Sequence, residues 1–79
     1  MTIHVSMENI ESSSHHPCGC PTALAILDIM PDNTLVGVFD NGIRINNIEY
    51  LLPDIVKQFI TDFDNGKEVS PYSFELVKR

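Results

Sequence analysis

The stretch TLVGVFDNGIRIN, residues 34–46, decides the fold of this chain. Asn41 and Gly42 tolerate a positive φ, which predicts a two-residue type I′ turn between two antiparallel strands. Pairing Asp40 with Ile43 across this turn, and hence Val38 with Ile45, sorts alternate side chains onto two faces. The predicted core face consists of Val36, Val38, Ile43 and Ile45, and the opposite face carries Leu35, Phe39 and Arg44.

The residues after the hairpin predict a strand, a helix and a closing strand. Asn46 and Asn47 suit a second tight turn that leads into a short strand at 48–51. A helix is expected from Pro53 to Gly66, with the glycine as its C′ residue. Apolar residues at helical spacing define its buried face: Ile55, Val56, Phe59, Ile60 and Phe63. Further along, Tyr72, Phe74 and Leu76 alternate with less apolar residues, as in a strand at 72–77.

The residues before the hairpin predict a strand, a long loop and a helix. Ile3, Val5 and Met7 alternate with polar residues, which places His4 on the polar face of a strand. Residues 8–20 have no sustained period and are expected to form a loop. Pro21 suits the first position of a helix that ends before Pro31, with Cys20 or Gly19 as the N-cap. The core side of this helix would consist of Ala23, Leu24, Ile26, Leu27 and Met30.

These elements follow the order β-α-β-β-(β)-α-β, which predicts the α+β class. We expect a small two-layer sandwich, in which one antiparallel sheet carries both helices on one face. Because 79 residues can close only one hydrophobic core, residues 1–79 are expected to form a single domain.

Composition and charge narrow the classes of function. The chain is 43% apolar with a mean hydropathy near zero, which is typical of a globular protein. Eleven carboxylates against five cations give a net charge of −6, so direct binding to nucleic acid or to an anionic membrane is not expected. No apolar run is long enough for a membrane span, and the N-terminus does not resemble a secretion signal. We therefore expect a cytoplasmic protein with reduced thiols.

The segment HHPCGCP, residues 15–21, concentrates possible metal ligands. Imidazole and thiolate groups are good zinc ligands, and a structural site needs four of them in a tetrahedron. The spacing is unfavourable, because a single residue separates the two cysteines where zinc motifs usually have two to four. We expect no cofactor, and zinc is the alternative. Its candidate ligands are Cys18, Cys20, His15, His16 and His4.

Cys20 has two further interpretations. At a helix N-terminus its thiolate would be stabilised by the helix dipole and by free N–H groups, as in reactive thiols. The simpler interpretation is a small side chain that seats the start of the helix. A disulfide between Cys18 and Cys20 would close a tight, strained ring and is not expected.

Motifs of common enzymes are absent from the sequence. Asp-Asn-Gly occurs at 40–42 and 64–66, but neither copy lies in a calcium-binding loop of twelve residues. Glycine-rich phosphate loops and the G-x-S-x-G motif do not occur either. We therefore expect that the protein is not an enzyme.

Three segments together resemble a group of small proteins of tailed phages and prophages. They are CPTALAI at 20–26, YLLP at 50–53 and FITDFDNGKEVSPYSFEL at 59–76, and the resemblance covers roughly residues 3–76. It implies a phage or mobile-element origin, and hence the cytoplasm of an infected or lysogenic bacterium. Cys20 matches the cysteine before proline in that group, whereas Cys18 and the two loop histidines match no fixed motif.

Charge and resemblance together suggest a protein that binds and inhibits a host protein. The target would be a defence or nucleic-acid-processing complex, in the manner of anti-CRISPR proteins, with carboxylates in place of nucleic acid phosphates. The exposed face of the hairpin, with Leu35, Phe39 and Arg44, could also form a homodimer. The alternatives are a zinc-stabilised interaction module and a protein that reacts through Cys20. Candidate acidic contacts are Asp32, Asp40, Glu49, Asp54, Asp62, Asp64 and Glu68.

Overall fold

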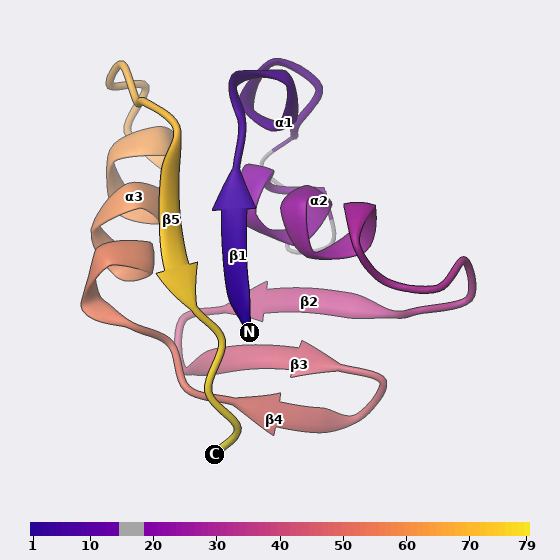
Figure 1. Cartoon of the computed structure of the whole chain (residues 1–79). Coiled ribbons are helices and arrows are strands. Elements are labelled where there is room, and N and C mark those ends of the chain that lie inside the picture. The colour runs from indigo at the N-terminus through magenta and orange to yellow at the C-terminus, as the bar shows by residue number, and fades with distance from the viewer. Residues whose placement is uncertain (15–18) are drawn as a thin grey trace.

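A computed structural model describes residues 1–14 and 19–79, which contain five strands and three helices (Figure 1). Along the chain these are β1 (Thr2–Val5), α1 (Met7–Glu11), α2 (Pro21–Asp28), β2 (Val36–Phe39), β3 (Gly42–Ile45), β4 (Ile48–Tyr50), α3 (Asp54–Asp64) and β5 (Tyr72–Glu75). All strand pairs are antiparallel. The predicted α+β class is confirmed.

The strands form two sheets, so the prediction of one continuous sheet is wrong. β1 pairs with β5, while β2, β3 and β4 form a separate sheet with β3 in the centre. The C-terminal residues connect the two sheets, because they continue from β5 along the edge of β4. There the Leu51 N–H donates to the Val77 carbonyl at 2.8 Å, and the Arg79 N–H donates to the Glu49 carbonyl at 3.1 Å.

The hydrophobic core lies between the two sheets, α2 and α3. β1 and β5 run crosswise to β2, β3 and β4, with α2 beside β1 and α3 beside β5 (Figure 1). Short strands that cross in this way bury the inner faces of both sheets against each other. The predicted core face of the hairpin is confirmed, and the core also takes in the apolar faces of β1 and β5. Its buried residues include Ile3, Val5, Ala23, Ile26, Val36, Val38, Ile43, Ile45, Val56, Phe59, Phe74 and Leu76.

The hairpin uses a different turn from the one predicted. Phe39 pairs with Gly42 and Val38 with Ile43, so the two loop residues are Asp40 and Asn41. The predicted pairing of Asp40 with Ile43 is therefore wrong by two residues. A shift of two residues preserves the faces of a strand, and for this reason the core face was still predicted correctly. The second turn is confirmed, with positive φ at Asn46 and Asn47.

A short helix occupies the start of the predicted 8–20 loop. The Ser6 hydroxyl accepts the Asn9 N–H at 3.1 Å, and the Asn9 side chain accepts the Ser6 N–H at 2.9 Å, which completes a capping box. Asn9 also donates to Asp28 at 2.7 Å and thereby ties α1 to α2. β1 consequently ends at Val5, and the predicted place of Met7 on the core face is wrong because Met7 lies exposed in α1.

The two longer helices begin and end close to the predicted residues. Cys20 is the N-cap of α2, as one of the two predicted alternatives required. In α2 the smaller residues Thr22, Ala23 and Ala25 are buried beside Ile26, whereas Leu24 is only half-buried. Gly66, with a φ of 75°, follows α3 as predicted. The burial of Ile55 was predicted wrongly, because it lies about 100° around the helix from the buried Val56 and is 51% exposed.

Candidate functional site

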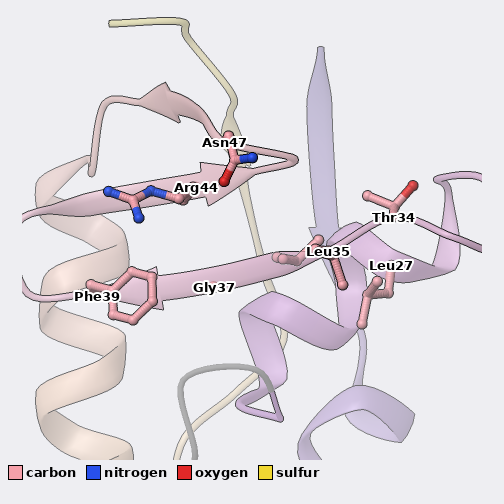
Figure 2. Close-up of a pocket in the computed structure, with 8 residues that line it drawn as sticks. Leu27, Thr34, Leu35, Gly37, Phe39, Arg44 and Asn47 are labelled. Atoms are coloured by element: carbon pink, nitrogen blue, oxygen red, sulfur yellow. The ribbon is translucent and has the colours of Figure 1, made fainter.

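Exposed apolar side chains line a depression on the outer face of the β2–β3–β4 sheet. Leu35 is 74% exposed and Phe39 is 42% exposed, and both share this face with Arg44, as predicted. Between them lies an open trough of about 440 Å³ (Figure 2). It is lined by Leu27, Thr34, Leu35, Val36, Gly37, Phe39, Arg44 and Asn47.

Gly37 forms the floor of this trough and determines where the Phe39 ring lies. A Cβ atom on Gly37 would lie only 2.4 Å from Cε2 of Phe39, so the ring lies across the glycine. A side chain at position 37 would therefore displace the ring. The apolar surface of the trough depends on this glycine. Because Gly37 has no side chain, the Phe39 ring covers the sheet at this position.

Charged groups of both signs border the trough. Arg44 pairs with Glu49 on the neighbouring strand at 3.4 Å, and Arg79 approaches the same carboxylate at 4.0 Å. Arg79 also donates to the Asn41 carbonyl at 2.7 Å, which fixes the C-terminal residue beside the hairpin turn. These side chains are about half exposed, so water screens both ion pairs and they contribute little to stability.

A second, smaller depression of about 220 Å³ lies between the tip of the hairpin and α3. Phe39 lines this depression as well as the trough, so its ring separates the two. The other lining residues combine apolar contacts with one cation and one carboxylate: Asp40, Leu52, Lys57, Ile60 and Thr61.

The predicted acidic contacts do not gather on one face. Asp32 lies in the turn between α2 and β2, which is on the opposite side of the molecule from α3 (Figure 1). Asp40 lies in the hairpin turn and Glu49 on β4, while Glu68 follows α3. The remaining three belong to α3: Asp54, Asp62 and Asp64. The carboxylates therefore surround the molecule on several sides.

Many of the carboxylates have no cation beside them. Asp62 accepts a hydrogen bond from Gln58 and lies 3.8 Å from Lys67, and Glu49 is paired as described above. In residues 1–14 and 19–79, seven other carboxylates form no ion pair, although Asp28 accepts a hydrogen bond from Asn9: Glu8, Glu11, Asp28, Asp32, Asp40, Asp54 and Glu68. Their charge is available to an external cationic group.

The proposed zinc ligands fall partly outside the described residues, which do not include His15, His16 and Cys18. The two that are described lie on different sides of β1. His4 is exposed, with its Nδ1 atom 2.7 Å from the Ser73 hydroxyl, whereas Cys20 is buried in the core that Ile3 and Val5 also enter. Within the described part of the chain, no group of three or more His, Cys, Asp or Glu side chains could hold a metal ion.

The environment of Cys20 opposes the activation that its position suggested. Its sulfur accepts the Ala23 N–H at 3.4 Å, as the helix start predicts. Burial nevertheless raises the pKa of the Cys20 thiol, because the loss of water disfavours the thiolate more than the backbone N–H groups favour it. This direction favours the simpler interpretation, a small side chain that seats the start of the helix, over the alternative of a reactive thiolate.

Sequence reasoning overlooked a polar pair beside Cys20. The Tyr72 and Thr22 hydroxyl groups lie 2.6 Å apart and join β5 to the first turn of α2. Thr22 has no exposed surface, so its hydroxyl depends on this partner. Burial raises the pKa of Tyr72 to about 12, although the hydrogen bond to Thr22 lowers it in part.

The raised pKa of Tyr72 predicts a loss of stability at alkaline pH. The contribution of Tyr72 to the free energy of unfolding is complete below pH about 10, because the tyrosine of the unfolded chain also keeps its proton there. Between about 10 and about 12, only the unfolded chain releases the proton, so the free energy of unfolding should fall. Tyrosine absorbance of the Tyr50→Phe variant follows Tyr72 alone. Half-ionisation near pH 12 is expected, and half-ionisation near 10 would contradict this environment.

Comparisons with protein families, curated proteins and solved structures found no match to this chain. In the described residues, no helix is both long and apolar enough to cross a membrane.

The trough could not be predicted in full, because Leu27 reaches it from α2 and Asn47 from the turn before β4. The signal for Gly37 was its place among valines in a strand, where glycine often marks a close approach.

Proposed function

We propose that this chain is a non-enzymatic protein that binds a host protein and inhibits it. The proposed setting is the cytoplasm of a bacterium that carries a phage or mobile element, as the resemblance of the sequence implies. The proposed target is a complex that defends the host or processes nucleic acid, and the binding surface is acidic.

The observation that carries this proposal is the excess of unpaired carboxylates. Protein grooves that hold nucleic acid are rich in Lys and Arg. Carboxylates held on a folded surface can occupy the positions of phosphates and attract such a groove over a distance. Asp32, Asp40 and Asp54 are exposed and form no ion pair, so each of them adds to this attraction from its own side of the molecule.

An infection assay tests this proposal. A panel of bacterial strains, each with one defence system that targets nucleic acid, would express the chain before challenge with a sensitive phage. The wild-type chain is expected to restore plaque formation on at least one strain. Substituting Asp32→Asn, Asp40→Asn and Asp54→Asn together is expected to abolish most of that effect.

The matched control keeps the charge. Asp32→Glu, Asp40→Glu and Asp54→Glu alter the same positions and should retain protection, because the carboxylates remain. Both triple variants must show the circular dichroism spectrum and thermal transition of a folded chain. Equal protection by the two variants, or no protection by the wild-type chain on any strain, would reject the acidic-inhibitor proposal.

A further inference from the structure

The outer face of the β2–β3–β4 sheet has no covering element among the described residues. The inner face of this sheet enters the core through Val36, Val38, Ile43 and Ile45. On the outer side lie Leu35, Phe39 and Arg44, with Leu27 of α2 beside Leu35 and α3 beside Phe39 (Figure 2). An antiparallel sheet can keep one face in water, but that face is then usually polar. Here it combines exposed apolar side chains with a trough.

The same face holds a protruding apolar side chain and a hollow that could receive one. Leu35, the most exposed large apolar residue described, lies at one end of β2, and the trough extends from it toward Phe39. In an interface with twofold symmetry, residue i of one copy contacts residue j of the other, and j contacts i. A face that carries both a protrusion and a hollow meets this requirement.

The charges also fit a contact between two copies. Most of the carboxylates without an ion pair lie elsewhere, and they repel a second chain of net charge −6. The outer sheet face combines the cations Arg44 and Arg79 with the carboxylate Glu49, and Asp40 lies in the hairpin turn at its end, so the charges of this face balance. A second copy therefore meets no net repulsion at this face, and Arg44 of one chain can approach Glu49 of the other because the two side chains lie side by side.

We propose that this face binds a second copy of the chain in a twofold symmetric contact. Leu35 of each copy occupies the trough of the other, between Phe39 and Arg44. The contact goes beyond the proposed inhibitory function and does not depend on it. It leaves Asp54 on α3 outside the contact, so that a dimer would present this carboxylate twice.

Sedimentation velocity and native mass spectrometry over a range of protein concentrations test the contact. The wild-type chain is expected to form a species of twice the 8.9 kDa chain mass. Leu35→Asp should abolish this species, because it places a charge in the partner's trough. Ile55→Asp is the matched control, since it adds the same charge at an exposed apolar position on α3 and should remain dimeric. A wild-type chain that stays monomeric at every concentration would overturn the proposal, as would a dimer that persists in Leu35→Asp.

A mixing experiment separates a true contact from damage to the fold. Arg44→Glu leaves acidic groups at positions 44 and 49, whereas Glu49→Arg leaves basic groups at both. Each variant alone should be largely monomeric, because like charges meet across the twofold axis. An equimolar mixture should form a heterodimer, which native mass spectrometry distinguishes by mass. If the mixture remains monomeric while the wild-type chain dimerises, the dimer uses another face and the proposal fails. In that case the trough becomes a candidate surface for an apolar segment of a different protein.

Discussion

Replacing Ile43 with alanine is expected to lower the free energy of unfolding by about 2–5 kcal/mol. Ile43 has no exposed surface and lies on the central strand β3, where it pairs with Val38 on one side and Tyr50 on the other. The substitution removes apolar contacts and leaves a cavity that the two crossed sheets cannot easily close. Since small domains have a total stability of only about 5–15 kcal/mol, this loss would be a large fraction. Urea unfolding followed by circular dichroism measures it.

Ile48→Ala is the matched control for this prediction. Ile48 lies in the same sheet and is also an isoleucine replaced by alanine, but it is 42% exposed on the edge strand β4. Its loss should cost well under half as much as the loss of Ile43. Equal losses at the two positions would contradict the deeper burial of Ile43 on the central strand.

Replacing Thr22 with valine is expected to lower the free energy of unfolding by about 1–3 kcal/mol, although the two side chains are similar in shape. The substitution removes the 2.6 Å hydrogen bond between Thr22 and Tyr72 and leaves the tyrosine hydroxyl without this partner. A polar group that loses its only protein partner in a desolvated place costs more than the bond itself contributed. Thermal and urea unfolding at neutral pH measure the loss.

The double variant distinguishes this hydrogen bond from a simple packing defect. Tyr72→Phe removes the other hydroxyl, and Thr22→Val with Tyr72→Phe removes both. Because an apolar pair has no unsatisfied group, the double variant should lose less stability than the sum of the two single variants. Strict additivity would mean that the two hydroxyl groups do not interact in the folded chain.

The faces of the strands could be predicted from the sequence more securely than the pairing between strands. Alternation with a period of two placed Val36, Val38, Ile43 and Ile45 inside without knowledge of the turn. The turn itself was predicted wrongly, because Asn-Gly is only a statistical preference for a type I′ turn, and Asn41 and Gly42 do not adopt a positive φ here.

Local sequence patterns indicate the short helix α1 only weakly, and they do not indicate the division into two sheets. α1 has five residues and too short an apolar period to detect, although Ser6 and Asn9 give a capping signal three residues apart. The division into two sheets follows from the pairing of β1 with β5, which are about seventy residues apart in the chain. No local pattern reports such a contact.

The candidate site was predictable only in part for the same reason. Strand alternation identified Leu35, Phe39 and Arg44 as neighbours on one face. The trough also requires Leu27, which reaches this face from α2 through tertiary packing. For Cys20, the helix position was predicted correctly, whereas the choice between a reactive and a structural thiol depends on burial, which is a property of the whole fold.

The central claim is that the chain recognises a host protein through its carboxylates. The most direct test is the salt dependence of binding between the purified chain and the host protein that co-purifies with it from a protected strain. Affinity is expected to fall steeply as the salt concentration rises, because ions screen contacts between exposed charges. The Asp32→Asn, Asp40→Asn, Asp54→Asn variant should bind more weakly and respond less to salt than the Asp→Glu control. Binding that is indifferent to salt, and equal for the two variants, would contradict the account.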